Sequence, residues 1–451
     1  MRLIGGRPGD AALVTGEGVC TFGDLDARVK VRVAGLGGVE APVIVVTASM
    51  TIDFVVGLLA ALGARRPAAV FSPHWNASER RAALALLGAC AEVGRAGEVT
   101  VRRDGPVADL HPDTRLILFT TGSTGEPKAV QLSETNIESN TAAVVDAVSF
   151  ATARAQVLFL PLSYSYGLLG QLLPALRTGV ATELVERLVD VADRFARGSA
   201  EGMVSGVPSH HAALLRLVPP GSACPRVTHV VSAGAAASPE LRRRLRDAFP
   251  GAVIYANYGQ TEASPRVLCL PSSHPKFFTT ATGFPVGRLS VRLGEDGELL
   301  VRGPQVMLGY LGDPDGTTRK LAGGWLHTGD LATLDDEGLV TVNGRADDLI
   351  NVGGERMSLI EVEAALAGVS GVRHAAAVAV TDELYGTAWA AYVEPAGDEV
   401  TADQVREGLR LRLPPRKMPA SLHLIRELPL TQNGKVDRRA LAALSRTPAR
   451  S

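Results

Sequence analysis

The stretch TTGSTGEPK, residues 120–128, decides how this chain is interpreted, because it places glycines, hydroxyls and a lysine directly after the apolar run RLILF (115–119). A glycine-rich loop after a buried strand presents several backbone N–H groups to one point, which suits the oxygen anions of a polyphosphate. The loop is not a Walker loop, since two residues separate Gly125 from Lys128 and no hydroxyl follows the lysine. A plain polar hairpin turn is the alternative that the stretch alone leaves open.

The composition indicates a sizeable globular protein without a general attraction to nucleic acid or lipid. The 451 residues are 46% hydrophobic, and a length of about 150 residues per domain predicts two or three domains. The 46 basic and 47 acidic residues nearly cancel, so a specific site has to explain any partner. The four cysteines are widely spaced and form no CxxC pair, which argues against a metal cluster or a disulfide framework.

Hydrophobic patterning predicts an α/β protein with two domains. Short apolar runs such as VIVV (43–46) and AAVF (68–71) alternate with helix-like stretches such as residues 53–62, which predicts layered α/β structure. From about Arg345 the pattern restarts with an amphipathic helix and further strands. We therefore expect a large N-terminal α/β domain over residues 1–345 and a small C-terminal α+β domain over residues 346–451. The chain shows neither a signal-peptide core nor a long apolar span, so a cytoplasmic location is expected.

Five ordered motifs between Phe119 and Leu441 resemble one known family. They are FTTGSTGEPKAV (119–130), YGQTEAS (258–264), GELLVRGPQVMLGYL (297–311), GWLHTGDLATLDDEGLVTVNGRADDLINVGGERMSLIEVE (324–363) and PLTQNGKVDRRAL (429–441). In sequence and order they are similar to the signatures of the acyl-adenylate-forming superfamily, which includes acyl-CoA synthetases, peptide-synthetase adenylation domains and firefly luciferase. The resemblance implies a multi-subdomain N-terminal domain, a small mobile C-terminal domain, and a ligase that uses ATP and Mg²⁺.

The resemblance also implies roles for individual residues around the phosphates. Converting a carboxylate to a mixed anhydride with AMP requires cationic, hydroxyl and metal contacts. By resemblance, Ser123, Thr124 and Lys128 contact the β- and γ-phosphates. Thr261 binds near the α-phosphate, and Glu262 helps to hold Mg²⁺, which prefers oxygen ligands. The other residues that the resemblance places at ATP or AMP are Thr120, Thr121, Gly122, Gly125, Gly234, Ala235, Ala236, Tyr258, Gly259, Asp330 and Arg345.

Three of these positions have more specific implied roles. Tyr258 stacks on adenine, and the segment SAGAAASPE (232–240) resembles the adenine-lining loop. Asp330 in HTGD and Arg345 in NGRADD bind the ribose hydroxyls. Taken singly, Tyr258 as a core aromatic, Asp330 as a turn residue and Glu262 as a solvated acid are equally good explanations. Only the ordered set of motifs favours the functional interpretation.

The C-terminal motif implies a catalytic lysine and a domain rotation. Lys435 lies in QNGKVD, where Asn433-Gly434 predicts a tight turn. Its family counterpart bridges the attacking carboxylate and the α-phosphate. Asp347 matches the family hinge, and Gly353 and Gly354 match the loop that leaves room for a pantetheine arm.

Three further residues are candidates for the acid pocket. Tyr164 stands where many acyl-CoA synthetases have histidine. Ser165 occupies the place where members that activate α-amino acids carry an aspartate, so an α-amino acid is not expected. With Asn257, these residues favour a small or medium aryl or unsaturated acid, although Ser165 as an ordinary turn residue remains an alternative.

The sequence therefore predicts an AMP-forming acid–thiol ligase whose acceptor is CoA or the phosphopantetheine of a separate carrier protein. Two alternatives stay open: an adenylating enzyme that transfers to an amine or activates a non-carboxylic oxyanion, and a catalytically idle nucleotide-binding regulator. Fold resemblance alone does not settle the second substrate. Neither nucleic-acid nor membrane partners are expected, and the oligomeric state is left undetermined.

Overall fold

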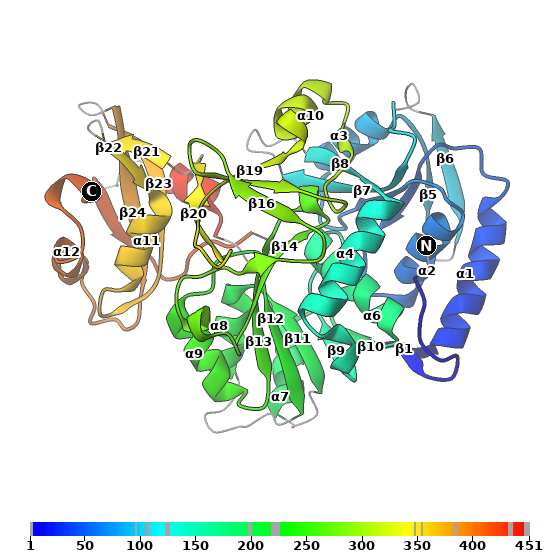
Figure 1. Ribbon diagram of the computed structural model, residues 1–451, viewed down its shortest axis with the longest axis horizontal. Coiled ribbons are helices and arrows are strands. Elements are labelled where there is room, and N and C mark those ends of the chain that lie inside the picture. Colours follow the sequence, from blue (N-terminus) through cyan, green and yellow to red (C-terminus); the bar gives the residue numbers. More distant parts are fainter. Residues whose placement is uncertain are drawn as a thin grey trace. The chain divides into compact units, whose positions relative to one another are not determined.

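The computed structural model describes most of the chain, which folds into two compact units (Figure 1). The first unit consists of Met1–Arg292, Leu300–Thr328 and Asp335–Val340, and the second of Leu293–Leu299, Gly329–Leu334 and Thr341–Ser451. The division at residues 345 and 346 stays a prediction. The described residues are 3–94, 97–103, 105, 109–121, 127–196, 201–217, 226–346, 349–352, 355–382, 386–431 and 436–445.

One sheet of the first unit contains the strands predicted at VIVV, AAVF and RLILF. Within the described residues its order is β18-β8-β7-β4-β3-β5-β6. The four strands β7, β4, β3 and β5 are parallel, and β6 and β8 are antiparallel additions at either side. The strands are β3 (Ile44–Thr47), β4 (Ala68–Phe71), β5 (Ala89–Val93), β6 (Val99–Arg103), β7 (Thr114–Thr121), β8 (Pro127–Ser133) and β18 (Gly309–Leu311).

The helices of this region begin at capping residues that the sequence supplies. The predicted helix at residues 53–62 is confirmed as α2 (Ile52–Gly63), and it begins where the Thr51 hydroxyl accepts from the Phe54 N–H. α2 is buried along almost its whole length because nearly every residue is apolar. The neighbouring helices are α1 (Phe22–Leu36), α3 (Ala77–Leu87) and, after β18, α10 (Pro314–Lys320).

A second sheet of the first unit carries most of the predicted site. Its order in the described residues is β15-β14-β13-β12-β11-β9-β10-β1-β2. Between β13 and β1 in this order, each strand runs parallel to the next. The strands are β1 (Ala11–Thr15), β2 (Gly18–Thr21), β9 (Ala155–Leu158), β10 (Ala181–Leu184), β11 (Gly202–Gly206), β12 (Val227–Ser232), β13 (Val253–Gly259), β14 (Arg266–Pro271) and β15 (Phe284–Pro285).

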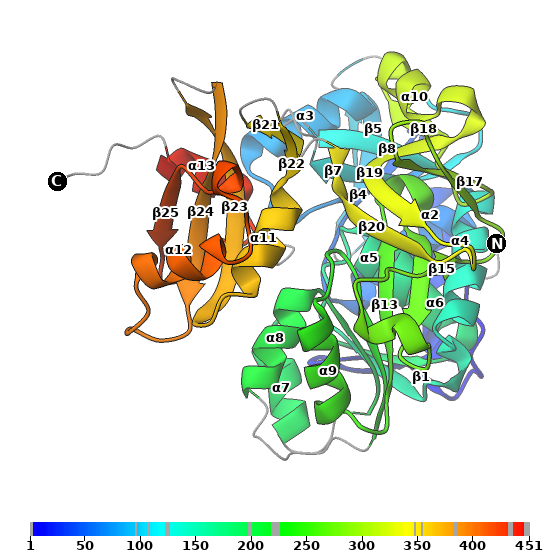
Figure 2. The ribbon, with the colours of Figure 1, turned by 60° about the vertical axis from the view of Figure 1, so that its left-hand side comes forward.

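Helices cover both faces of this second sheet. Figure 2 shows α7 (Leu188–Ala196), α8 (Pro208–Leu217) and α9 (Pro239–Ala248) side by side on one face of β11 to β13. On the other face lie α4 (Glu134–Ala147), α6 (Leu173–Thr178) and the segment that precedes α6. That segment runs through α5 (Ser165–Gly167) into a π-helix, η2 (Leu168–Leu172). A π-helix widens the turn, and such turns are frequent at functional sites.

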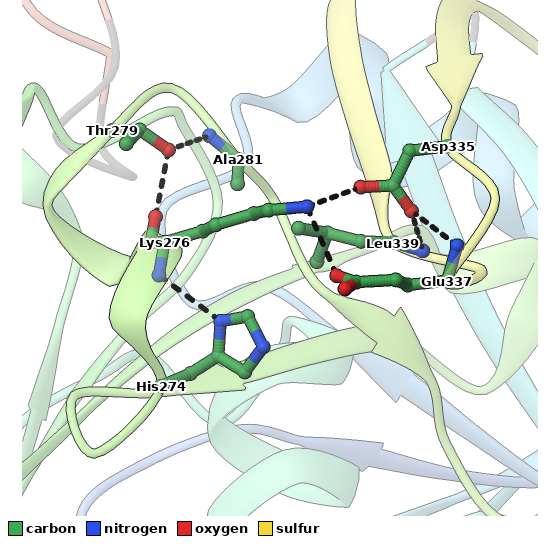
Figure 3. A network of polar contacts seen from close by, with 7 residues as sticks. All are labelled: His274, Lys276, Thr279, Ala281, Asp335, Glu337 and Leu339. Atoms are coloured by element: carbon green, nitrogen blue, oxygen red, sulfur yellow. Dashed lines mark hydrogen bonds and ion pairs between the residues drawn. The ribbon is translucent and has the colours of Figure 1, made fainter.

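A polar network fixes the turn that follows β19 (Leu326–Leu334) within the first unit (Figure 3). Lys276, in the short helix η4 (Pro275–Phe278), lies with its Nζ 2.8 Å from Asp335 Oδ2 and 3.0 Å from Glu337 Oε2. Asp335 also accepts from the backbone N–H of Leu339.

β19 belongs to a sheet of order β16-β17-β19-β20, with β16 (Ser290–Leu293), β17 (Glu298–Arg302) and β20 (Val340–Arg345).

The second unit confirms the α+β pattern predicted after Arg345. Trp389 is fully buried in its core, and its indole N–H donates to the Lys417 carbonyl at 3.1 Å. β24 pairs antiparallel with β23 and parallel with β25. The elements of the unit are β21 (Leu349–Val352), β22 (Glu355–Ser358), β23 (Val372–Asp382), β24 (Gly386–Pro395), β25 (Ser421–Leu424), α11 (Leu359–Ala367), α12 (Ala402–Arg410) and α13 (Arg438–Ser445).

Candidate active site

The predicted phosphate loop connects two paired strands. β7 and β8 run antiparallel, with Thr120 opposite Lys128 and Thr121 opposite Pro127. The stretch therefore connects two neighbouring antiparallel strands. Four of the predicted loop residues lie outside the described residues: Gly122, Ser123, Thr124 and Gly125.

Lys128 and Glu262, from two different motifs, meet on one tyrosine. The Lys128 ammonium lies 5.0 Å from the centre of the Tyr310 ring. The Tyr310 hydroxyl donates to Glu262 Oε1 at 2.7 Å, and the Glu262 carbonyl accepts from the Met307 N–H at 2.8 Å. A cation over an aromatic face and a charge-assisted hydrogen bond both restrict side-chain freedom. Tyr310 therefore positions the predicted phosphate lysine and the predicted magnesium carboxylate relative to each other.

A hydrogen bond joins the predicted acid pocket to the predicted reaction centre. Ser165 Oγ and Thr261 Oγ1 lie 2.8 Å apart, and Ser165 is buried. Thr261 is the first residue of the short helix η3 (Thr261–Ala263), and Tyr164 is the residue that precedes α5. The Tyr164 carbonyl accepts from the Leu168 N–H at 3.0 Å. Ser165 is thus placed at Thr261 by the start of a helix.

The end of β13 carries three further predicted residues in sequence. Asn257 is buried, and its Nδ2 donates weakly to the Ser232 carbonyl at 3.4 Å, whereas its Oδ1 has no hydrogen-bond partner within the described residues. Tyr258 is half-buried on the same strand. Gly259 is required by packing, because a Cβ there would lie 1.7 Å from the Pro265 carbonyl oxygen.

The predicted adenine-lining residues lie at the same edge of the sheet as Tyr258. Gly234, Ala235 and Ala236 are exposed and follow the carboxyl end of β12. β12 and β13 are parallel neighbours, so their carboxyl ends meet at one sheet edge. In open parallel sheets, ligands bind outside this edge. The arrangement fits a nucleotide base beside Tyr258.

Two predicted ribose residues form a pair in the second unit. Arg345 Nη1 lies 3.8 Å from Asp330 Oδ1, on β20 and β19 respectively. The Arg345 side chain is 48% exposed and that of Asp330 is 14% exposed, so the pair contributes little to stability. The structure brings these two residues together and leaves the arginine accessible.

The remaining predictions fall on residues outside the described part of the chain. These are the hinge residue, the two glycines of the thiol loop and the catalytic lysine: Asp347, Gly353, Gly354 and Lys435.

Comparison with known proteins decides the family. Residues 90–311 match the AMP-binding enzyme family, and residues 361–435 match the AMP-binding enzyme C-terminal domain. A feruloyl-CoA synthase of Amycolatopsis sp is 34% identical over 365 residues, which are 76% of this chain and 72% of the relative. The chain belongs to the AMP-binding enzyme family. This confirms the acyl-adenylate-forming resemblance inferred from the motifs.

Solved structures confirm the fold class that the family implies. ATP-bound MatB from Rhodopseudomonas palustris superposes with a TM-score of 0.83 at 23% identity, covering 97% of this chain and 96% of that chain. O-succinylbenzoate coenzyme A synthetase from Bacillus subtilis, in complex with ATP and a magnesium ion, has a TM-score of 0.80 at 23% identity, covering 96% and 97%. The chain is therefore an α/β protein with a large N-terminal and a smaller C-terminal domain, as predicted. In the described part of the chain, no helix has the length and apolar character needed to cross a bilayer.

The residues around Glu262 fit the magnesium ion that the family implies. The described residues contain no group of three or more His, Cys, Asp or Glu side chains that could hold a metal. Mg²⁺ usually takes one or two carboxylates and completes its shell with water and substrate phosphates. The single carboxylate of Glu262, which directly follows Thr261 in the chain, matches that requirement.

Sequence reasoning missed two residues of this region. Tyr310 lies inside the motif GELLVRGPQVMLGYL, yet no role was assigned to it, although an aromatic residue between Gly309 and Leu311 was the available signal. Arg266 interrupts an otherwise apolar strand, RVLCLP, directly after the YGQTEAS motif. An arginine in a buried strand is the kind of exception that points to a specific environment.

Proposed function

We propose that this chain catalyses ATP-dependent activation of a small or medium carboxylic acid, aryl or unsaturated, to acyl-AMP and then transfers the acyl group to a pantetheine thiol. The observation that carries the proposal is the contact between Lys128, Tyr310 and Glu262, next to the hydrogen bond between Thr261 and Ser165. It gathers a cation, a carboxylate and hydroxyls, which are the groups that adenylation requires.

In the first half-reaction a carboxylate oxygen attacks the α-phosphorus of ATP, and pyrophosphate leaves. Lys128, with the loop residues Ser123 and Thr124, stabilises the negative charge on the leaving pyrophosphate. Thr261 orients the α-phosphate, and Lys435 brings the two anions together. Mg²⁺ held through Glu262 supplies Lewis-acid neutralisation of the phosphate oxygens.

In the second half-reaction a thiolate attacks the acyl carbon, and AMP leaves. CoA is the proposed acceptor because the feruloyl-CoA synthase relative, 34% identical, is named for CoA transfer. The phosphopantetheine of a carrier protein has the same thiol and is the other outcome of the acceptor test. We propose that Asp347 is the hinge between the two half-reactions and that Gly353 and Gly354 admit the pantetheine arm.

The acid-binding wall of the pocket supports an aryl or unsaturated substrate. Tyr164 and Ser165 precede the π-helix, and Asn257 offers a buried Oδ1 without a hydrogen-bond partner in the described chain. A serine at position 165 provides no anion for an α-ammonium group. The name of the feruloyl-CoA synthase relative points to the same class of acid.

Acid-dependent ATP–pyrophosphate exchange tests the proposal without the unknown acceptor. We expect exchange with one class among aryl, hydroxyaryl, aminobenzoic, short-chain and long-chain acids, and loss of exchange without Mg²⁺. Lys435→Ala should lower exchange by at least about 100-fold, while thiolation of supplied acyl-AMP continues. Lys417→Ala is the matched control, since Lys417 is bound to Glu361 in the second unit. Absence of exchange with every carboxylic acid contradicts the proposal.

A further inference from the structure

The first residue of β14, Arg266, is a buried cation whose guanidinium has no hydrogen-bond partner among the described residues. Arg266 is buried, with a relative exposure of 2%. Within the described residues, none of Nε, Nη1 and Nη2 has a hydrogen-bond partner. A buried guanidinium is ordinarily paired and hydrogen-bonded, because removing a charge from water is costly. The guanidinium therefore keeps donors that no acceptor in the described part of the chain uses.

Several contacts hold this arginine in one place. Its backbone N–H donates to Asn140 Oδ1 at 3.1 Å, and its carbonyl accepts from Gln305 Nε2 at 2.9 Å. The guanidinium carbon lies 5.5 Å from the centre of the Tyr166 ring. A Cβ at Gly170, on the π-helix, would lie 3.4 Å from Nη2, so the guanidinium packs close to the helix at this glycine. The side chain is positioned from both the strand and the helix.

The ionisable neighbours of Arg266 do not neutralise its charge. They are Tyr166 and Cys269. Burial raises the pKa of the Cys269 thiol to about 12 and also raises the pKa of the Tyr166 phenol. Both groups are therefore neutral near pH 7, and arginine keeps its proton. These described neighbours therefore supply no negative charge to Arg266.

The position of Arg266 connects it to the acid pocket. Tyr166 directly follows Ser165, whose hydroxyl contacts Thr261 at 2.8 Å. Arg266 also lies opposite Gly259 in the pairing of β13 with β14. Arg266 is thus linked to Thr261 through two neighbouring residues, because its guanidinium lies against the Tyr166 ring and Ser165 contacts Thr261.

We propose that Arg266 is a specificity residue that binds a second carboxylate of the acid substrate. This inference rests on the proposed function and refines it: the enzyme activates one carboxylate of a dicarboxylic acid and holds the other. Arginine suits this role because its planar fork makes two parallel hydrogen bonds to a carboxylate. The second carboxylate supplies the anion that the buried cation lacks.

Matched acid pairs test the inference on the full chain by ATP–pyrophosphate exchange. The pairs are benzoate with its three carboxybenzoates, cinnamate with its carboxycinnamates, and hexanoate with adipate. We expect the wild type to prefer one dicarboxylic member over its monocarboxylic partner by at least about tenfold in kcat/KM. Arg266→Met should lower kcat/KM for that acid by roughly 10- to 100-fold, since a hydrogen bond to a charged group is lost. The monocarboxylic partner should change by less than about threefold.

Arg242→Met is the matched control, because Arg242 is also a buried arginine but all its described contacts are with backbone carbonyls and an aromatic ring. It should leave the ratio of dicarboxylic to monocarboxylic kcat/KM unchanged. Arg266→Lys, which keeps the charge and loses the fork, should fall between the wild type and Arg266→Met. The preferred diacid should also raise the melting temperature of the wild type and not that of Arg266→Met.

Two outcomes separate this inference from the proposed function. If no acid supports exchange in the wild type, the proposed function is contradicted, and the inference falls with it. If the wild type exchanges with monocarboxylic acids and prefers them in every pair, the function stands and the role of Arg266 is wrong. That second result depends on the wild type alone, so it remains decisive even if Arg266→Met does not fold. A parallel loss with both members of a pair in Arg266→Met also contradicts the role.

Discussion

Two buried arginines in the first unit show how differently the same side chain is accommodated. Arg242, on α9, is 4% exposed, and Arg266, on β14, is 2% exposed. Each lies against an aromatic ring, Phe277 at 5.1 Å and Tyr166 at 5.5 Å. Their burial and their aromatic neighbours are therefore alike, and only their hydrogen bonds distinguish them.

Arg242 donates to the backbone around η4 through Nε and Nη1. Its Nε donates to the Ala237 carbonyl at 3.1 Å, and its Nη1 donates to the carbonyls of Phe277 and Ala281 at 2.7 and 2.9 Å. Arg266 has no such carbonyls within the described residues. The difference teaches that burial alone does not assign a role: a satisfied cation holds a fold together, whereas an unsatisfied one points to a ligand.

The largest effect is expected for Arg242→Met. The substitution leaves the buried carbonyls of Phe277 and Ala281 without their donor, so the free energy of unfolding should fall by about 3–5 kcal/mol. Urea denaturation followed by circular dichroism measures it. A loss below about 1 kcal/mol would show that the carbonyls find other donors, and the contrast with Arg266 would disappear.

Arg266→Met should act in the opposite direction in the absence of substrate. Removing an uncompensated buried charge stabilises a fold, while the lost contact with the Tyr166 ring offsets part of the gain. We expect the free energy of unfolding to stay unchanged or to rise by up to about 2 kcal/mol. The same denaturation measurement applies, with Arg242→Met measured alongside. A loss as large as that of Arg242→Met would assign Arg266 a purely structural role.

A smaller effect is expected for Gly170→Ala, which tests the packing that holds Arg266. The new methyl would lie 3.0 Å from Tyr166 Cδ2 and 3.4 Å from Arg266 Nη2. The Tyr166 ring has little freedom to move, because its hydroxyl donates to the Val231 carbonyl at 3.0 Å. We expect the free energy of unfolding to fall by about 1 kcal/mol.

A double-mutant cycle sharpens this prediction. In the Arg266→Met background the loss caused by Gly170→Ala should shrink, because the flexible methionine side chain yields more easily than the guanidinium. An identical loss in both backgrounds would mean that only the tyrosine meets the new methyl, and that Gly170 does not position the arginine.

The sequence predicted the fold better than it predicted these contacts. Apolar runs such as AAVF became strands because a buried parallel strand requires continuous apolar residues, and that requirement is local. The motif YGQTEAS begins within β13, and Thr261 and Glu262 follow the end of that strand in η3.

Tyr310 and Arg266 could not be assigned in the same way. Tyr310 acts on Glu262 through a hydrogen bond between segments that lie far apart in the chain. Arg266 meets the Tyr166 ring only because β14 packs against the segment that leads into the π-helix. Such roles depend on which side chains the tertiary structure brings together. An arginine within an apolar strand was the only sequence signal for the second of them.

The smallest effect is expected for a cation that is neither buried nor unsatisfied. Lys276 is 45% exposed and contacts both Asp335 and Glu337. Exposed ion pairs contribute little to stability, so Lys276→Ala should lower the melting temperature by less than about 2 °C. The hydrogen bonds from Lys276 hold the pKa of Asp335 below its ordinary value, and those carboxylates raise the pKa of Lys276.

The sign of these shifts fixes the pH dependence of the Lys276 contribution. A carboxylate whose pKa is lowered by folding stabilises the protein at pH values above its unfolded-state pKa, and this stabilisation is lost as the pH falls through its folded-state pKa. A lysine whose pKa is raised by folding stabilises the protein at pH values below its unfolded-state pKa, and this stabilisation is lost as the pH rises through its folded-state pKa. The difference between wild type and Lys276→Ala should therefore be constant near neutral pH, vanish in acid and in strong alkali, and shrink with added salt. Melting curves at several pH values and salt concentrations measure it. A large, salt-independent loss would place Lys276 with Arg242, among the cations that the fold requires.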